Sequence, residues 1–231
     1  MPGRRDFTGQ ILHALAYRRP EPFLGQRVVV VGAGNSAVQI AVELAQGAQV
    51  SLAVRRPVQF VPQRPLGRDI HDWLRWLWVE QLPLGLFGRL HSPRSVFDPS
   101  VYRAAFRRGQ PDQRPMFRRF TPRGVVWSSG VREAVDSVIF ATGYRPDLDF
   151  LRGTGALDAG GEPVQRLGRS VTVPGLYYVG LSGQRAYASA TLRGADLDAR
   201  AVVKHLTGFL GGTGRRADVR MAETAPPDHG G

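Results

Sequence analysis

The feature that most constrains the fold is a run of four valines followed by a glycine-rich turn. Residues 28–31 are apolar and β-branched, as in a strand buried on both faces of a parallel sheet. Residues 32–37 read Gly-Ala-Gly-Asn-Ser-Ala, a pattern that turns such a strand directly into a helix and predicts a dinucleotide site. Gly32 makes the tight turn, Gly34 lets phosphates approach the backbone, and Ala37 keeps the helix close to the strand. The residues that we expect to hold a pyrophosphate are Gly32, Gly34, Asn35 and Ser36.

The hydrophobic pattern predicts further elements on both sides of this turn. A strand at 27–31, a helix at 36–45 and a strand at 49–54 form a βαβ unit. Downstream, the pattern predicts a short helix near 101–106, a hairpin over 124–135, strands at 136–141 and 175–180, and a helix over 195–210. The fold class that follows is α/β with a Rossmann-like domain.

Composition excludes several classes of function. The chain has no cysteine, which rules out disulfides, thiolate metal sites and cysteine nucleophiles, and we expect no metal. The net charge of +12 comes from basic residues that are all arginine except Lys204. These arginines are mostly scattered, so we expect a solvated basic surface and no nucleic-acid partner. The first residues lack an apolar signal core, which favours a cytoplasmic protein.

The most aromatic stretch lies at residues 69–90 and contains Trp73, Trp76 and Trp78. Charged residues and Pro83 interrupt it, so that no run reaches the roughly 20 apolar residues that a membrane span needs. We expect an amphipathic helix packed at a domain seam. Peripheral membrane contact is the less favoured alternative.

Arg55 and Arg56 bear on the choice of nicotinamide cofactor. They follow the predicted strand at 49–54, where an acidic residue would accept a hydrogen bond from the adenosine ribose of NAD. Two guanidinium groups instead suit a 2′-phosphate, through charge-assisted bidentate bonds. The pattern therefore favours NADPH. The alternative is that both are ordinary surface residues of an arginine-rich protein.

The chain resembles the flavin-containing monooxygenases in three motifs. Phe7, Gly9, His13, Tyr17 and Arg18 match every fixed position of that family's signature F-x-G-x-x-x-H-x-x-x-Y/F-K/R. Phe-Ala-Thr-Gly-Tyr at 140–144 and Pro-Gly-Leu-Tyr-Tyr-Val-Gly-Leu at 174–181 are similar to two later motifs of the family. Together the motifs cover residues 1 to about 210.

This resemblance implies a domain organisation. The NADPH-binding domain is an insertion in a FAD-binding domain, as in flavoproteins with two dinucleotide-binding domains. We expect an interdomain linker over 1–25, the NADPH domain over 26–135, the C-terminal half of the FAD domain over 136–210, and a disordered tail over 211–231. Thr142, Gly143, Gly180 and Leu181 would line the flavin side. No second glycine fingerprint occurs in the 231 residues, so we expect the C-terminal portion of a longer protein, with Met1 an internal methionine.

The resemblance also implies a reaction. NADPH reduces FAD, and a flavin hydroperoxide formed with O2 transfers one oxygen atom to a small-molecule substrate. Tyr17 and Arg18 favour N- or S-oxygenation over Baeyer–Villiger chemistry by resemblance. No catalytic side chain is singled out, and His13 is expected at a domain seam. We expect impaired FAD binding by this chain alone, unless a second chain supplies the other FAD half-domain. The alternative is an NADP-binding module or remnant without turnover.

Overall fold

The computed structural model describes residues 1–69, 72, 76, 95–186 and 188–211. The chain divides into two compact units. Unit 1 consists of Met1–Trp73 and His91–Tyr144, and unit 2 of Leu74–Leu90 and Arg145–Gly231.

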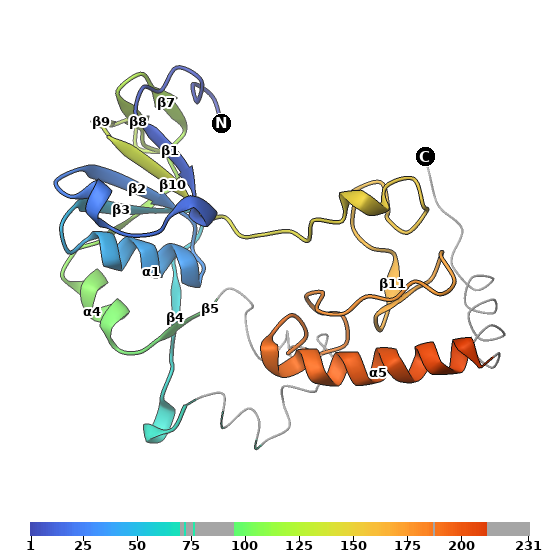
Figure 1. Cartoon of the computed structure of the whole chain (residues 1–231). Coiled ribbons are helices and arrows are strands. Elements are labelled where there is room, and N and C mark those ends of the chain that lie inside the picture. Colours follow the sequence, from blue (N-terminus) through green and yellow to red (C-terminus); the bar gives the residue numbers. More distant parts are fainter. Residues whose placement is uncertain (70–71, 73–75, 77–94, 187, 212–231) are drawn as a thin grey trace. The chain divides into compact units, whose positions relative to one another are not determined.

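Unit 1 is built on a five-stranded parallel sheet with the strand order β1-β10-β2-β3-β6 (Figure 1). Its strands are β1 (Gln10–His13), β2 (Arg27–Val31), β3 (Gln49–Val54), β6 (Asp112–Pro115) and β10 (Ser137–Phe140). Helix α1 (Asn35–Leu44) connects β2 to β3. The predicted βαβ unit is thus confirmed to within a residue at each boundary.

The valine run is buried on both faces of the sheet, as predicted. Val28 and Val30 pack in one cluster with the apolar face of α1. Val29 and Val31 face the opposite cluster, which contains Phe120 from a second sheet. That sheet is antiparallel and consists of β7 (Arg119–Thr121), β8 (Gly124–Val126) and β9 (Arg132–Ala134). Strands β8 and β9 form the hairpin that the sequence predicted over 124–135.

Unit 1 also contains several smaller elements. Strands β4 (Gln59–Pro62) and β5 (Ser95–Asp98) form a separate parallel pair. Helix α4 (Val101–Arg107) confirms the short helix expected near 101–106. Short 3-10 turns follow β1 at η1 (Ala14–Ala16), precede β2 at η2 (Glu21–Phe23), and follow β4 at η3 (Pro65–Gly67).

Residues 1–25 differ from the expected linker because they are folded into unit 1. Strand β1 forms an edge of the main sheet by pairing with β10. Phe7 and Phe23 are buried, one in each of the two clusters. The glycines and prolines that suggested a linker serve local turns and close packing. A Cβ at Gly9, for example, would collide with the carbonyl oxygen of Asp136 and with the ring of Phe7.

The expected domain boundary after residue 135 also differs from the structure. The strand predicted at 136–141 is β10, which lies between β1 and β2 in the sheet of unit 1. Val138 and Ile139 are fully buried there, one against each cluster. Removing β10 from this unit would expose both. The first compact unit therefore extends to Tyr144.

Unit 2 contains η5 (Asp149–Leu151), a short hairpin of β11 (Gln165–Arg166) and β12 (Arg169–Ser170), and helix α5 (Leu192–Leu210). Helix α5 confirms the predicted final helix. The strand expected at 175–180 is absent from the described structure, where that segment makes one isolated bridge, Tyr177 to Arg169. An apolar run needs a continuous partner to form a strand, and the two-residue β12 is too short to supply one.

Two predictions fall on residues that the structure leaves undescribed. Of the aromatic segment 69–90, only Asp69, Asp72 and Trp76 are described, and the predicted amphipathic helix lies outside that set. The predicted disordered tail, beyond Gly211, lies outside it as well. Within the described ranges, no helix combines the length and the apolar character that a membrane crossing requires.

Candidate functional site

The glycine turn between β2 and α1 requires glycine at its first position. Gly32 has a φ of +142°, and a Cβ there would lie well under 3.0 Å from the carbonyl oxygen of Ala141. Ala141 directly follows β10, and its N–H donates to the carbonyl of Val31 at 2.8 Å. Gly34 lies in open space, with no described atom within 4 Å of the position that a Cβ would take. The backbone at Gly34 is therefore accessible to a ligand.

The start of helix α1 leaves backbone donors available. Gly34 is the N-cap residue and offers no side chain to cap the first amides, and Gly34, Asn35 and Ser36 are exposed. The first intrahelical bond runs from the Val38 N–H to the Gly34 carbonyl at 3.1 Å. Unpaired amides and the positive end of the helix dipole favour an anion at this position. The residues present thus fit a pyrophosphate.

Asn35 contributes differently from the other residues of the turn. Its side-chain Oδ1 accepts a hydrogen bond from the backbone N–H of Phe97 at 3.3 Å. This bond attaches β5 to the start of α1, so the Asn35 side chain already has a partner within unit 1. Its backbone amide remains at the exposed start of the helix. We therefore assign any direct contact of Asn35 with a ligand to its main chain.

Arg55 and Arg56 lie one strand away from the turn. They directly follow β3, which pairs with β2 in parallel, so both segments reach the same edge of the sheet. Both side chains are exposed, and neither is paired with a carboxylate among the residues that the structure describes. The Val58 N–H donates to Gln113 Oε1 on β6 at 3.0 Å, which holds the segment after the arginines in place. Two unpaired guanidinium groups at this edge suit an anionic ligand.

Thr142 and Gly143 reach the same edge from the other side of the turn. They follow β10, and the contact between Gly32 and Ala141 places them next to the glycine turn. Both are exposed, and Gly143 has a φ of +97° with no described atom within 4 Å of its Cβ position. The turn therefore lies where the chain order reverses, with β3 on one side and β10 on the other. Ligands bind at such switch points in open α/β sheets.

The structure does not bring Gly180 and Leu181 together with the residues of unit 1, since both belong to unit 2. Gly180 has a φ of +90° and open space at its Cβ position among the described atoms. The Leu181 N–H donates to Gln184 Oε1 at 3.2 Å, and Gln184 Nε2 donates to the Tyr178 carbonyl at 2.8 Å. The buried Gln184 side chain thus fixes the backbone on both sides of Gly180. An assignment to the flavin side stays a prediction.

His13 and Tyr144 meet at this edge, a contact that the sequence reasoning did not anticipate. Their ring centroids are 5.5 Å apart with an interplanar angle of 81°. His13 ends β1 and Tyr144 ends the Phe-Ala-Thr-Gly-Tyr motif after β10. The parallel pairing of these strands brings the two residues together. The sequence alone does not show that β1 and β10 are neighbouring strands, because more than a hundred residues separate them.

Tyr17, another signature residue, anchors the segment before β2 to helix α1. Its hydroxyl donates to Glu43 Oε2 at 2.9 Å. Burial and this carboxylate raise the pKa of Tyr17 above its ordinary value. We expect Tyr17→Phe to destabilise the chain by about 1 kcal/mol, measured as a shift of the urea unfolding midpoint. Tyr102→Phe is the matched control and should leave the midpoint unchanged; equal shifts would contradict a role for the Glu43 bond.

Comparisons with known proteins agree with these features. The model of the flavin-binding monooxygenase-like family matches residues 1–67. A CzcO-like oxidoreductase of Geobacillus kaustophilus is 28% identical over 198 residues, which cover 84% of this chain and 56% of that protein. A human putative dimethylaniline monooxygenase (N-oxide-forming) is 32% identical over 66% of this chain and 34% of its own. The chain thus spans about half the length, or less, of these curated relatives.

A solved structure extends the similarity over most of the chain. The flavin-containing monooxygenase from Stenotrophomonas maltophilia superposes with a TM-score of 0.73 and 30% sequence identity. The match covers 90% of this chain and 58% of that protein. The signature from Phe7 to Arg18 and the glycine turn both lie in the region that the family model matches. The chain belongs to the flavin-binding monooxygenase-like family.

Proposed function

We propose that this chain is part of a FAD-dependent monooxygenase that uses NADPH and transfers one oxygen atom of O2 to a small-molecule substrate. The observation that carries the proposal is the accessible glycine turn at a switch point, with Arg55 and Arg56 one strand away and not paired with any carboxylate of the described residues. The relatives named as monooxygenases support it. The signature residues Tyr17 and Arg18 favour N- or S-oxygenation within this proposal.

The proposal gives each part of the site a binding role. The backbone at Gly34 and Ser36 would hold the pyrophosphate of NADPH, and Arg55 and Arg56 its 2′-phosphate. Gly180 and Leu181 in unit 2 would contribute backbone to a FAD site, which a second chain would complete if it supplied the remaining half-domain. FAD, when bound, supplies the redox chemistry. The residues of this chain bind and orient the cofactors, and we assign no acid or base to any of them.

The arginine pair gives the sharpest test of cofactor choice. We expect the double variant Arg55→Ala/Arg56→Ala to bind NADPH at least tenfold more weakly, since each lost charge-assisted bond is worth about 1.5–3 kcal/mol. The affinity for NADH should hardly change. The affinities are measured by titrating nicotinamide fluorescence with the chain. Arg118→Ala/Arg119→Ala, an exposed arginine pair on the antiparallel sheet, is the matched control; equal losses for NADPH and NADH in the first variant would refute the assignment.

A second experiment tests the chemistry. The chain is mixed with FAD and NADPH and then offered an amine, a sulfide and a cyclic ketone, with oxygen uptake and product mass as readouts. Oxygenated amine or sulfide would support the proposal, and oxygenated ketone would overturn the preference for heteroatoms. NADPH binding without oxygen uptake is expected both from the impaired FAD binding of this chain alone and from the alternative function, an NADP-binding module, so only oxygenated product separates the two.

A further inference from the structure

The topology of unit 1 separates the two halves of a bound dinucleotide. In the proposed function, on which this inference rests, the pyrophosphate lies at the turn after β2. Arg55 and Arg56 follow β3, so the phosphorylated adenosine half extends toward that side. The other half must then extend over the carboxyl ends of β10 and β1, which lie on the opposite side of β2.

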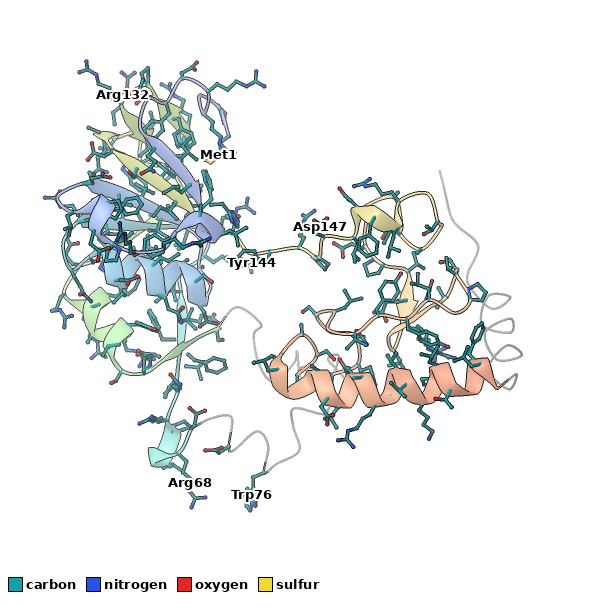
Figure 2. The ribbon with its side chains drawn as sticks, viewed as in Figure 1. Met1, Arg68, Trp76, Arg132, Tyr144 and Asp147 are labelled. Atoms are coloured by element: carbon teal, nitrogen blue, oxygen red, sulfur yellow. The ribbon has the colours of Figure 1, made fainter. Side chains whose placement is uncertain are left out.

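The residues exposed at those strand ends include an aromatic pair. His13 ends β1, and Tyr144 lies where the chain leaves unit 1 (Figure 2). The edge-on contact between their rings leaves Tyr144 63% exposed. Gly143, next to Tyr144, faces open space among the described atoms. An exposed aromatic ring held in place beside an open backbone segment offers a surface on which a planar ring can stack.

His13 is oriented by a hydrogen bond. Its Nδ1 accepts from the Leu15 N–H at 3.2 Å, so in the neutral imidazole the proton resides on Nε2. The Nε2–H is then a donor at the sheet edge. Neighbouring strands lie about 4.8 Å apart, which places the ends of β3 and β1 roughly 14 Å from one another. An extended dinucleotide can span that distance.

We propose that His13 and Tyr144 bind the nicotinamide half of NADPH in unit 1. The ring of Tyr144 stacks on the nicotinamide, and His13 Nε2–H donates to an oxygen of the nicotinamide ribose or carboxamide. Both residues bind and position the cofactor and take no part in proton transfer. The arrangement gives a chemical purpose to one signature residue, His13, and to the last residue of the Phe-Ala-Thr-Gly-Tyr motif.

The test compares NADP⁺ with 2′-phospho-ADP-ribose, which lacks the nicotinamide ring. Calorimetric titration of the full chain should show that His13→Ala and Tyr144→Ala each weaken NADP⁺ binding roughly tenfold. Neither variant should change the affinity for 2′-phospho-ADP-ribose. Tyr144→Phe keeps the ring and should bind NADP⁺ almost as well as the unaltered chain. Val131→Ala, an exposed apolar residue between β8 and β9, is the control for surface truncation.

The outcomes separate this inference from the proposed function. If His13→Ala and Tyr144→Ala weaken both ligands equally, or weaken neither, the nicotinamide assignment is wrong while the NADPH site stands. If the unaltered chain binds neither ligand, the proposed function fails and the assignment fails with it. Loss of NADP⁺ affinity alone, with 2′-phospho-ADP-ribose as the internal check on folding, would establish the contact.

Discussion

Gly32→Ala is expected to destabilise unit 1 by about 2–5 kcal/mol and to abolish measurable NADPH binding. Two effects add. The φ of +142° is one that side chains rarely adopt, and the new Cβ would collide with the carbonyl of Ala141. Because that carbonyl belongs to the backbone at the end of β10, it cannot move aside without opening the sheet. Domains are stable by only about 5–15 kcal/mol, so the loss is a large fraction of the total.

Hydrogen exchange of the amides in β2 and β10 measures this effect within unit 1. Gly34→Ala is the matched control, since its φ of −90° suits alanine and its Cβ would enter open space. That variant should keep exchange protection close to that of the unaltered chain while still weakening NADPH, because the Cβ occupies the position expected for phosphate. Equal loss of protection in both variants would show that the contact with Ala141 is unimportant.

Glu133→Ala is expected to destabilise unit 1 by about 2–4 kcal/mol, because Glu133 connects three parts of the fold. Its carboxylate accepts from Arg27 Nε at 2.8 Å, Arg114 Nη1 at 3.0 Å and Trp127 Nε1 at 2.5 Å. The Glu133 side chain is 24% exposed, so solvent screens part of the effect. Removing it leaves two guanidinium groups and an indole N–H without this acceptor.

The same carboxylate predicts a loss of stability in acid. Burial alone would raise the pKa of Glu133, but hydrogen bonds from Arg27 and Trp127 and the charges of Arg27 and Arg114 hold it below its ordinary value. A lowered pKa in the folded state stabilises the fold above the unfolded pKa of about 4.3, and this stabilisation is lost as the pH falls through the folded value. The difference in unfolding free energy between the unaltered chain and Glu133→Ala should therefore shrink below about pH 4.

Urea unfolding at a series of pH values tests both expectations. Glu21→Ala is the matched control, since Glu21 is exposed and its distance to Arg19 is 3.8 Å. Its removal should change the stability by less than about 1 kcal/mol at any pH. If Glu133→Ala lowers the free energy of unfolding by the same amount from neutral pH to pH 3, the pKa argument is wrong. If it lowers that free energy as little as Glu21→Ala does, the hydrogen bonds that Glu133 accepts do not stabilise the fold.

The sequence predicted the central βαβ unit well because its signals are local. Four consecutive valines are typical of a strand buried on both faces, and the helical period of α1 lies within ten residues. The assignment of strand 136–141 to the other domain failed for the opposite reason. Its apolar pattern indicates a buried strand but does not say which strand it pairs with, and its partners β1 and β2 lie more than a hundred residues earlier.

Residues 1–25 are a second case in which local sequence patterns did not show which distant residues a segment contacts. Their glycines and prolines are typical of a linker, yet Phe7 and Phe23 are buried in the two hydrophobic clusters of unit 1. The gain from burying two aromatic rings outweighs the weak local preference of the segment. No periodicity within 25 residues could have shown where those rings pack.

The sequence by itself predicted a glycine turn between a buried strand and a helix, the kind of turn that can hold a phosphate, because glycine spacing fixes the backbone that such a turn requires. It also placed Arg55 and Arg56 one strand from that turn, since β3 follows directly through α1. Only the tertiary structure decided which residues lie on the side of the glycine turn opposite to β3. The pairing of β10 between β1 and β2 brings Thr142, Gly143, Tyr144 and His13 to the same edge. Such pairing depends on contacts between distant segments, which local sequence patterns do not encode.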